Sequence, residues 1–182
     1  MGLLFKKMRI VLSLFIFLLL FVVLSKPAVA NSEYVLPYPS TMPGGALYKI
    51  HAISEYIQRY WYFGSFGQFS YNLKKSDKYL VEAKTLFEYK QYLLGSKALS
   101  KSNSYFLKIK PSLSQAKKEG KDISEKLKLF NSAIEKHKEV LEQIRKDVPR
   151  DVLWSPEKDS ATKIMLHQEI EQAIRLRTRL YE

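Results

Sequence analysis

Apolar residues between positions 122 and 148 recur at alternating spacings of four and three, and this seam constrains the fold more than any other feature of the chain. Its members are Ile123, Leu127, Phe130, Ile134, His137, Leu141, Ile144 and Val148. Such spacing places every member on one face of a helix that packs in a bundle or a coiled coil. Asp122, followed by Glu125, is typical of a helix start, and Pro149 ends the pattern. We expect a helix over about 122–148, whose seam pairs either within the chain or with a second copy in a homo-oligomer.

Helical spacing of apolar residues predicts further helices over about 46–63, 69–94, 98–120 and 155–181. No segment shows the alternation of a strand, so the expected fold class is all-α. The expected architecture is a bundle of about five helices within residues 47–182.

Glycine, proline and capping residues set the expected helix boundaries. Gly64 is expected to end the first helix, with Ser65–Gln68 as the connection, and Gly95-Ser96 is expected to divide the hairpin of residues 69–120. Pro111 should either kink the third helix or divide it. Ser155-Pro156 is typical of a helix start and predicts that the last helix begins there.

Residues 31–46 are rich in proline and read as an extended strap. Pro37, Pro39 and Pro43 restrict their own backbone and that of the residue before each of them. Because the tyrosine, valine, leucine and methionine side chains of this segment are too apolar for a free linker, we expect the strap to lie against the helices.

The first thirty residues have the features of a secretory signal peptide. A positive start at residues 6–9 precedes an apolar stretch from Ile10 to Leu24, and Ala28 and Ala30 form a small-x-small cleavage site. Cleavage would leave Asn31 as the first residue. The alternative is an uncleaved anchor, although an apolar stretch of fifteen residues falls short of the roughly 20 that span a bilayer as a helix. The chain has no cysteine, which excludes a disulfide framework and lipid attachment through a cysteine.

Positive charge is concentrated in the predicted hairpin. Residues 74–121 contain twelve lysines, no arginine and four acids, whereas the rest of the chain after residue 30 is neutral overall. The lysines are Lys74, Lys75, Lys78, Lys84, Lys90, Lys97, Lys101, Lys108, Lys110, Lys117, Lys118 and Lys121. They are candidates for binding an anionic surface, because a basic segment raises the local concentration of anionic partners. The alternative is a solvated helix face that keeps the protein soluble.

Eight aromatic residues crowd the stretch from Tyr56 to Tyr71, more than one helix face can bury. They either pack the junction between the first helix and the hairpin, or form an amphipathic rim that touches a membrane interface or a glycan.

The three histidines are the only side chains that ordinarily titrate near neutral pH. His51 and His167 each have a glutamate four residues on, Glu55 and Glu171, but neither pair belongs to a known metal-binding pattern. His137 occupies a seam position and is expected to be half-buried, with a hydrogen-bonded ring nitrogen. No nucleophile elbow or phosphate-binding glycine loop occurs. We therefore expect no catalytic, metal or cofactor-binding residues, and a protein that is not an enzyme.

The motif Leu36-Pro37-Tyr38-Pro39, followed by Pro43 and Leu47-Tyr48-Lys49, resembles a family of exported bacterial proteins whose domain has no assigned function. The resemblance covers approximately residues 34 to 110. It implies a signal peptide, a Leu-Pro-Tyr-Pro-Gly-like strap and a lysine-rich helical hairpin in an extracytoplasmic domain. It implies no activity and no catalytic residues.

Together these features predict an exported protein that is periplasmic, envelope-bound or secreted. The leading hypothesis is a non-enzymatic interaction module whose basic hairpin meets an anionic membrane surface, a wall polymer or an envelope protein. Nucleic acid is not an expected partner outside the cytoplasm. The alternative hypothesis is a periplasmic chaperone-like protein that holds apolar clients in a groove of the bundle.

Overall fold

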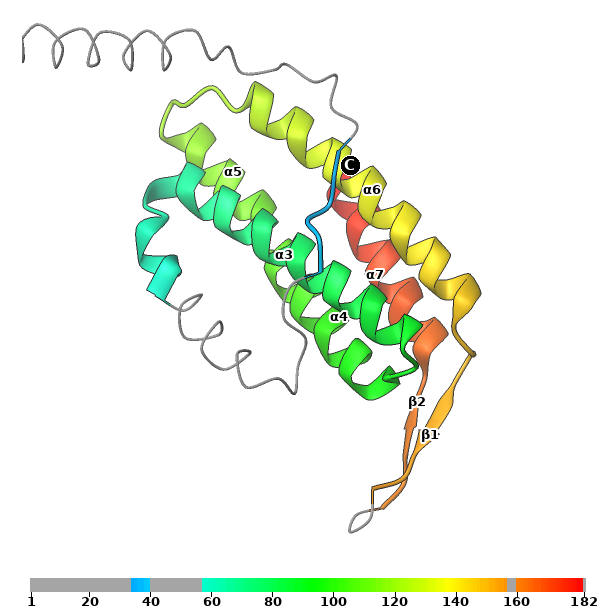
Figure 1. Cartoon of the computed structure of the whole chain (residues 1–182). Coiled ribbons are helices and arrows are strands. Elements are labelled where there is room, and N and C mark those ends of the chain that lie inside the picture. Colours follow the sequence, from blue (N-terminus) through cyan, green and yellow to red (C-terminus); the bar gives the residue numbers. More distant parts are fainter. Residues whose placement is uncertain (1–33, 40–56, 157–159, 182) are drawn as a thin grey trace, which may run out of the picture. The chain divides into compact units, whose positions relative to one another are not determined.

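Helices dominate the structure, which confirms the predicted all-α class (Figure 1). The computed structural model describes residues 34–39, 57–156 and 160–181, which belong to one compact unit. The helices are η1 (Arg59–Trp61, 3-10), α3 (Gly64–Glu88), α4 (Tyr92–Phe106), α5 (Ile109–Lys118), α6 (Ser124–Asp147) and α7 (Leu166–Tyr181). Strands β1 (Val152–Trp154) and β2 (Thr162–Ile164) form an antiparallel pair.

Several predicted features lie outside the described residues. They are the signal peptide of residues 1–30, its cleavage site at Ala28, Ala30 and Asn31, the strap beyond residue 39 and the helix expected from residue 46, with His51, up to residue 56. Among the helices that the structure describes, none has the length and apolar character to cross a membrane.

The turn between α3 and α4 differs from the prediction that Gly95-Ser96 would end a helix. Lys90 has a φ of 60°, and the backbone N–H groups of Lys90 and Gln91 donate to the carbonyls of Phe87 and Leu86, so the helix ends six residues earlier than expected. Gly95 instead lies inside α4, where a Cβ atom would stand 2.6 Å from the Phe87 ring. The glycine is needed for the close approach of two helices.

Replacing Gly95 with alanine is therefore expected to destabilise the protein. The Phe87 ring would have to move, which costs about 1–3 kcal/mol for an overpacked core and outweighs the roughly 1 kcal/mol that alanine gains in a helix. Denaturant unfolding measures the loss. Ser100→Ala, at an exposed position of α4, is the matched control and should not destabilise the protein. Equal stability of Gly95→Ala and wild type would contradict the close approach.

The third predicted helix is divided, one of the two outcomes expected from Pro111. The break falls at Leu107 and Lys108, and Pro111 lies in the first turn of α5. The missing N–H of proline costs nothing there, because the first N–H groups of a helix have no intrahelical partner.

Two helix starts were predicted wrongly. Gly64, which was expected to stop a helix, begins α3 with a φ of +67°, so the expected connection Ser65–Gln68 is the first turn of that helix. Ser155-Pro156 starts no helix, because the chain forms the β1–β2 pair and α7 begins only at Leu166. Pairing of Val152 with Ile164 brings both side chains against the apolar core, which a helix from residue 155 would not do.

Helix α6 matches the predicted seam closely. The Asp122 carboxylate accepts the Ser124 backbone N–H at 2.9 Å and lies at the start of the helix. Phe130, Ile134, Leu141 and Ile144 are buried within the chain's own core, whereas Leu127 is 44 % exposed. The seam therefore packs against α3, α4, α5 and α7 of the same chain over most of its length.

The described part of the strap, residues 34–39, lies against the helices as expected. Leu36 and Tyr34 are half-buried, and each packs against one of the two apolar clusters of the core. Val35 and Tyr38 point to solvent, with exposed fractions of 82 % and 95 %. The strap thus contacts the bundle through alternate side chains.

Candidate functional site

A layer of buried polar side chains separates two apolar clusters in the core. One cluster lies where α3 meets α5 and the start of α6, and the other lies toward the α3–α4 turn and the start of α7. Between them, the helices contribute Ser76 and Asp77 (α3), Ser102 and the half-buried Asn103 (α4), His137 (α6) and Arg177 (α7). Each of these residues falls at the helical position where an apolar core residue would otherwise stand.

Arg177 is the centre of this polar layer and is fully buried. Its Nε donates to His137 Nδ1 at 3.1 Å, and its Nη1 donates to Asn103 Oδ1 at 2.7 Å and to the Ala173 carbonyl at 3.0 Å. Its Nη2 donates to Ser102 Oγ at 3.1 Å, and the guanidinium carbon lies 4.6 Å from the centre of the Phe106 ring. The guanidinium is held by four helix-borne partners and one ring.

His137 links Arg177 to Asp77. Because the arginine Nε can only donate, His137 Nδ1 is the acceptor and Nε2 carries the hydrogen. Nε2 lies 2.7 Å from Asp77 Oδ1 and donates to it. The second carboxylate oxygen accepts a hydrogen bond from the hydroxyl of Tyr34, so the strap also contacts the polar layer.

Burial governs the protonation of this chain of groups. Burial lowers the pKa of His137 to about 4, the Arg177 charge adds to that shift, and the hydrogen bond to Asp77 opposes it. Burial also lowers the pKa of Arg177 to about 9, which leaves the guanidinium charged at neutral pH. Burial and the Asp77 carboxylate raise the pKa of Tyr34 far above its usual range. At neutral pH the layer therefore holds one carboxylate and one guanidinium, joined through a neutral imidazole.

This arrangement fits a structural role better than a catalytic one. The one lone pair of the imidazole already accepts the Arg177 hydrogen, so His137 has no basic nitrogen to offer a substrate. The two opposite charges satisfy each other through the ring, as buried charges must. The layer fixes the register of α3, α4, α6 and α7 relative to one another.

The sequence predicts only part of this polar layer. His137 was expected to be half-buried with one bonded nitrogen, whereas it is fully buried with both nitrogens bonded. Asp77 falls four residues after Leu73 and three before Leu80, on the apolar stripe of α3. Arg177 falls four residues after Ala173, on the apolar stripe of α7. Polar residues at apolar positions of two helices were the missed signal.

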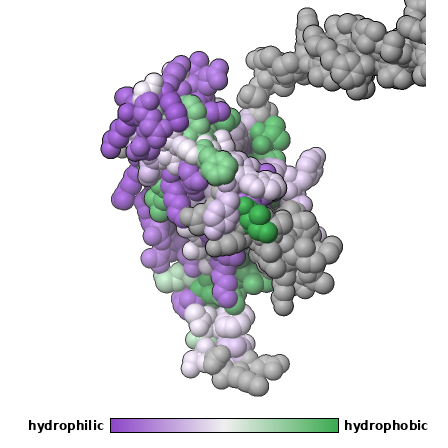
Figure 2. Space-filling view, turned by 90° about the vertical axis from the view of Figure 1, so that its left-hand side faces the viewer, coloured by the Kyte–Doolittle hydropathy of each residue, from purple (hydrophilic) through white to green (hydrophobic). Residues whose placement is uncertain are grey.

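The predicted lysine surface lies on α3, α4, α5 and the turns between them. Exposed members are Lys74, Lys90, Lys97, Lys101, Lys108, Lys110, Lys117, Lys118 and Lys121, while Lys78 and Lys84 are half-buried. Lys75 is a correction, because it is buried beside the Tyr71 ring and cannot belong to the surface. Figure 2 shows hydrophilic residues gathered at the end where α5 leads into α6.

The four acids of this segment are withdrawn from the surface or already paired. Asp77 and Glu82 are buried, with exposed fractions of 7 % and 4 %. Glu88 lies 3.1 Å from Lys84, and Glu119 lies 2.8 Å from Lys121. Hydrogen bonds from Lys121, Ser65 and Gln115 lower the pKa of Glu119 to about 2. The surface of the hairpin therefore carries its excess positive charge.

Aromatic residues occur beside these lysines in two places. Trp61 and Phe63 are 72 % and 80 % exposed just before α3, and Lys121 lies over the nearby Phe66 ring at 5.3 Å. Farther along α3, Tyr79 stacks on Tyr105 of α4. Phe69 and Tyr71 are buried, whereas Trp61 and Phe63 remain at the surface.

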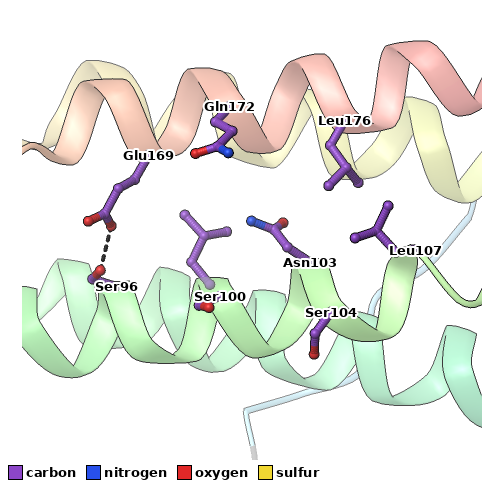
Figure 3. Close-up of a pocket in the computed structure, with 9 residues that line it drawn as sticks. Ser96, Ser100, Asn103, Ser104, Leu107, Glu169, Gln172 and Leu176 are labelled. Atoms are coloured by element: carbon purple, nitrogen blue, oxygen red, sulfur yellow. Dashed lines mark hydrogen bonds between the residues drawn. The ribbon is translucent and has the colours of Figure 1, made fainter.

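A groove of about 510 Å³ runs between α4 and α7 (Figure 3). Figure 3 shows the amides of Asn103 and Gln172 in the space between the helices, and a hydrogen bond joins Ser96 to Glu169. Its lining also includes the apolar residues Leu99, Leu107 and Leu176. Three of its polar side chains have partners within the protein: Ser96 donates to Glu169, Ser104 donates to the Lys101 carbonyl, and Asn103 accepts from Arg177.

The histidine–glutamate pair on α7 has other partners. His167 Nε2 lies 3.1 Å from the Val148 carbonyl, and Glu171 lies 3.5 Å from Arg175. The second pair, at residues 51 and 55, lies outside the described residues. Within the described ranges, no three histidine, aspartate or glutamate side chains come together as a metal site would require.

Comparisons with protein-family models, curated proteins and solved structures find no match to this chain.

Proposed function

We propose that this chain is an exported, non-enzymatic α-helical protein that binds an anionic component of the cell envelope through the lysine surface of α3, α4 and α5. Export rests on the leader at residues 1–30 and its cleavage site before Asn31. An envelope polymer, an anionic membrane or an envelope protein is then within reach, whereas nucleic acid is not.

One observation carries this proposal. The acids that could neutralise the hairpin are buried or already paired, so the lysines of α4 and α5 face solvent without a carboxylate partner among the described residues. Lys97, Lys110 and Lys117 are three such exposed side chains. A surface of this kind attracts polyanions over a distance set by the ionic strength.

Salt-dependent attachment tests the proposal. The full-length gene is expressed in a bacterium, cells are fractionated, and the envelope fraction is washed with increasing salt. We expect the protein in the envelope fraction at 0.05 M salt and its release by about 0.5 M, because the Debye length falls from about 10 Å at 0.1 M to about 3 Å at 1 M.

Intact mass of the recovered species provides the control for the leader. A species that starts at Asn31 and leaves with salt supports an electrostatically attached module. An intact species that resists salt means that residues 10–24 anchor the protein, and a protein found only in the soluble fraction at every salt concentration contradicts envelope binding.

A further inference from the structure

Two stacked tyrosines on the hairpin hold three lysine ammonium groups in fixed positions. Tyr79 of α3 and Tyr105 of α4 have ring centres 5.7 Å apart and ring planes inclined by 11°. Lys78 and Lys101 lie over the Tyr79 ring at 5.3 and 5.2 Å, and Lys108 lies over the Tyr105 ring at 5.2 Å. We call these five residues the tyrosine–lysine strip.

Contacts with the rings of Tyr71 and Tyr62 support the strip. Tyr71, which is only 6 % exposed, meets the Tyr105 ring edge-on with centres 6.0 Å apart, and Tyr62 contacts Tyr71 at 5.4 Å. The stacked rings are thus continuous with the buried part of α3. An ammonium within about 6 Å of a ring centre is attracted by the electron-rich face of the ring. The N–H groups of the exposed Lys101 and Lys108 stay available to an incoming anion.

The ammonium groups of Lys101 and Lys108 carry like charges, and an anion shared between them relieves their repulsion. Lys101 lies on α4 and Lys108 lies in the break between α4 and α5; both are exposed and have no carboxylate partner among the described residues. The last turn of α4 and part of the break after it separate the two residues along the chain. A flexible chain of phosphates can meet such separated ammonium groups one after another.

The strip fits a linear polymer better than a bilayer. Tyr79 and Tyr105 are half-buried and their faces are occupied by ammonium groups, so the strip presents no apolar side chain for insertion. The exposed aromatics Trp61 and Phe63 lie outside the strip, before the start of α3. Lysine binds phosphate as a point charge, which suits a repetitive phosphodiester more than one shaped headgroup.

We propose that the tyrosine–lysine strip is the binding site for a linear, phosphate-bearing polymer of the cell envelope. This inference rests on the proposed function and names its partner and its site. It places recognition in the fixed ammonium groups of the strip and not in the net charge of the hairpin.

Matched charge removal tests the inference on the protein recovered after export. One variant replaces the strip lysines, K78Q/K101Q/K108Q, and the control removes equal charge from exposed positions outside the lysine surface, K128Q/K146Q/R150Q. Binding of inorganic polyphosphate is measured by calorimetry in 0.05 M salt. We expect the strip variant to bind about tenfold more weakly and the control to change by less than about threefold.

A substitution that leaves charge unchanged sharpens the test. Tyr79→Leu removes the ring beneath two ammonium groups, and we expect about threefold weaker binding to polyphosphate. Tyr89→Leu, at a tyrosine that is 72 % exposed and outside the strip, should bind as wild type does. Circular dichroism verifies that each variant is folded before binding is compared.

The outcomes separate this inference from the proposed function. Equal weakening of both triple variants would show that net charge alone binds, which overturns the strip while envelope binding stands. Binding to vesicles of phosphatidylglycerol without binding to polyphosphate would overturn the polymer and favour a membrane. Failure to bind polyphosphate, vesicles and envelope material alike would overturn both.

Discussion

Replacing Arg177 with methionine is expected to lower the free energy of unfolding by about 3–5 kcal/mol, the loss typical when one partner of a buried charge pair is removed. Methionine fills much of the same volume but donates no hydrogen bond. The variant leaves the Asp77 carboxylate without its opposite charge and removes the donors to His137, Asn103 and Ser102. Denaturant unfolding at pH 7 measures the difference.

Two further variants separate the polar layer from general effects of the substitution. Arg179→Met changes an exposed arginine on the same helix and should alter stability by less than about 0.5 kcal/mol. Asp77→Asn in the Arg177→Met background removes the uncompensated charge and should recover part of the loss. Equal effects at positions 177 and 179 would show that the buried guanidinium does not hold the bundle together.

Acid is expected to destabilise the protein through His137. The folded-state pKa of His137 is about 4, below its ordinary value of 6.5, so the unfolded chain binds this proton first as pH falls. The free energy of unfolding should therefore fall with decreasing pH between about 6.5 and 4, by up to about 3 kcal/mol in total. Above pH 7 the imidazole is neutral in both states and contributes no pH dependence.

His137→Gln isolates this contribution. A glutamine oxygen can accept from Arg177 and its amide can donate to Asp77, but the side chain does not titrate. The difference between the unfolding free energies of wild type and variant should shrink as pH falls through that window, since only the wild type has a titrating side chain at position 137. In wild type, the NMR shifts of the His137 ring should stay those of neutral imidazole down to pH 5. A ring that is protonated at pH 6 would rule out the proposed polar layer.

Local pattern was sufficient for the helices whose apolar spacing is regular. The seam of α6 predicted that helix to within two residues at either end. A segment that is apolar once in every turn buries all its apolar side chains together only as a helix. The class of the fold followed from the same spacing in the other segments. The concentration of lysine between residues 74 and 121 was also visible without coordinates.

Local pattern failed where a residue's role depends on a distant neighbour. Gly95 was interpreted as a helix stop, yet its purpose is the approach of Phe87 from the preceding helix. Ser155-Pro156 carried a helix-start signal, yet pairing of Val152 with Ile164 decided that segment. In both places a contact between elements outweighed a propensity of at most about 1 kcal/mol.

The sequence by itself determined the helical class, the seam of α6 and the lysine content of the hairpin, because these depend only on spacing and composition. The tertiary structure alone decided that Asp77, His137 and Arg177 form one buried layer and that Tyr79 and Tyr105 order lysines from two helices. Each of those groupings joins residues from different helices. Their energies arise from burial and from distances between side chains, which no spacing along one segment contains.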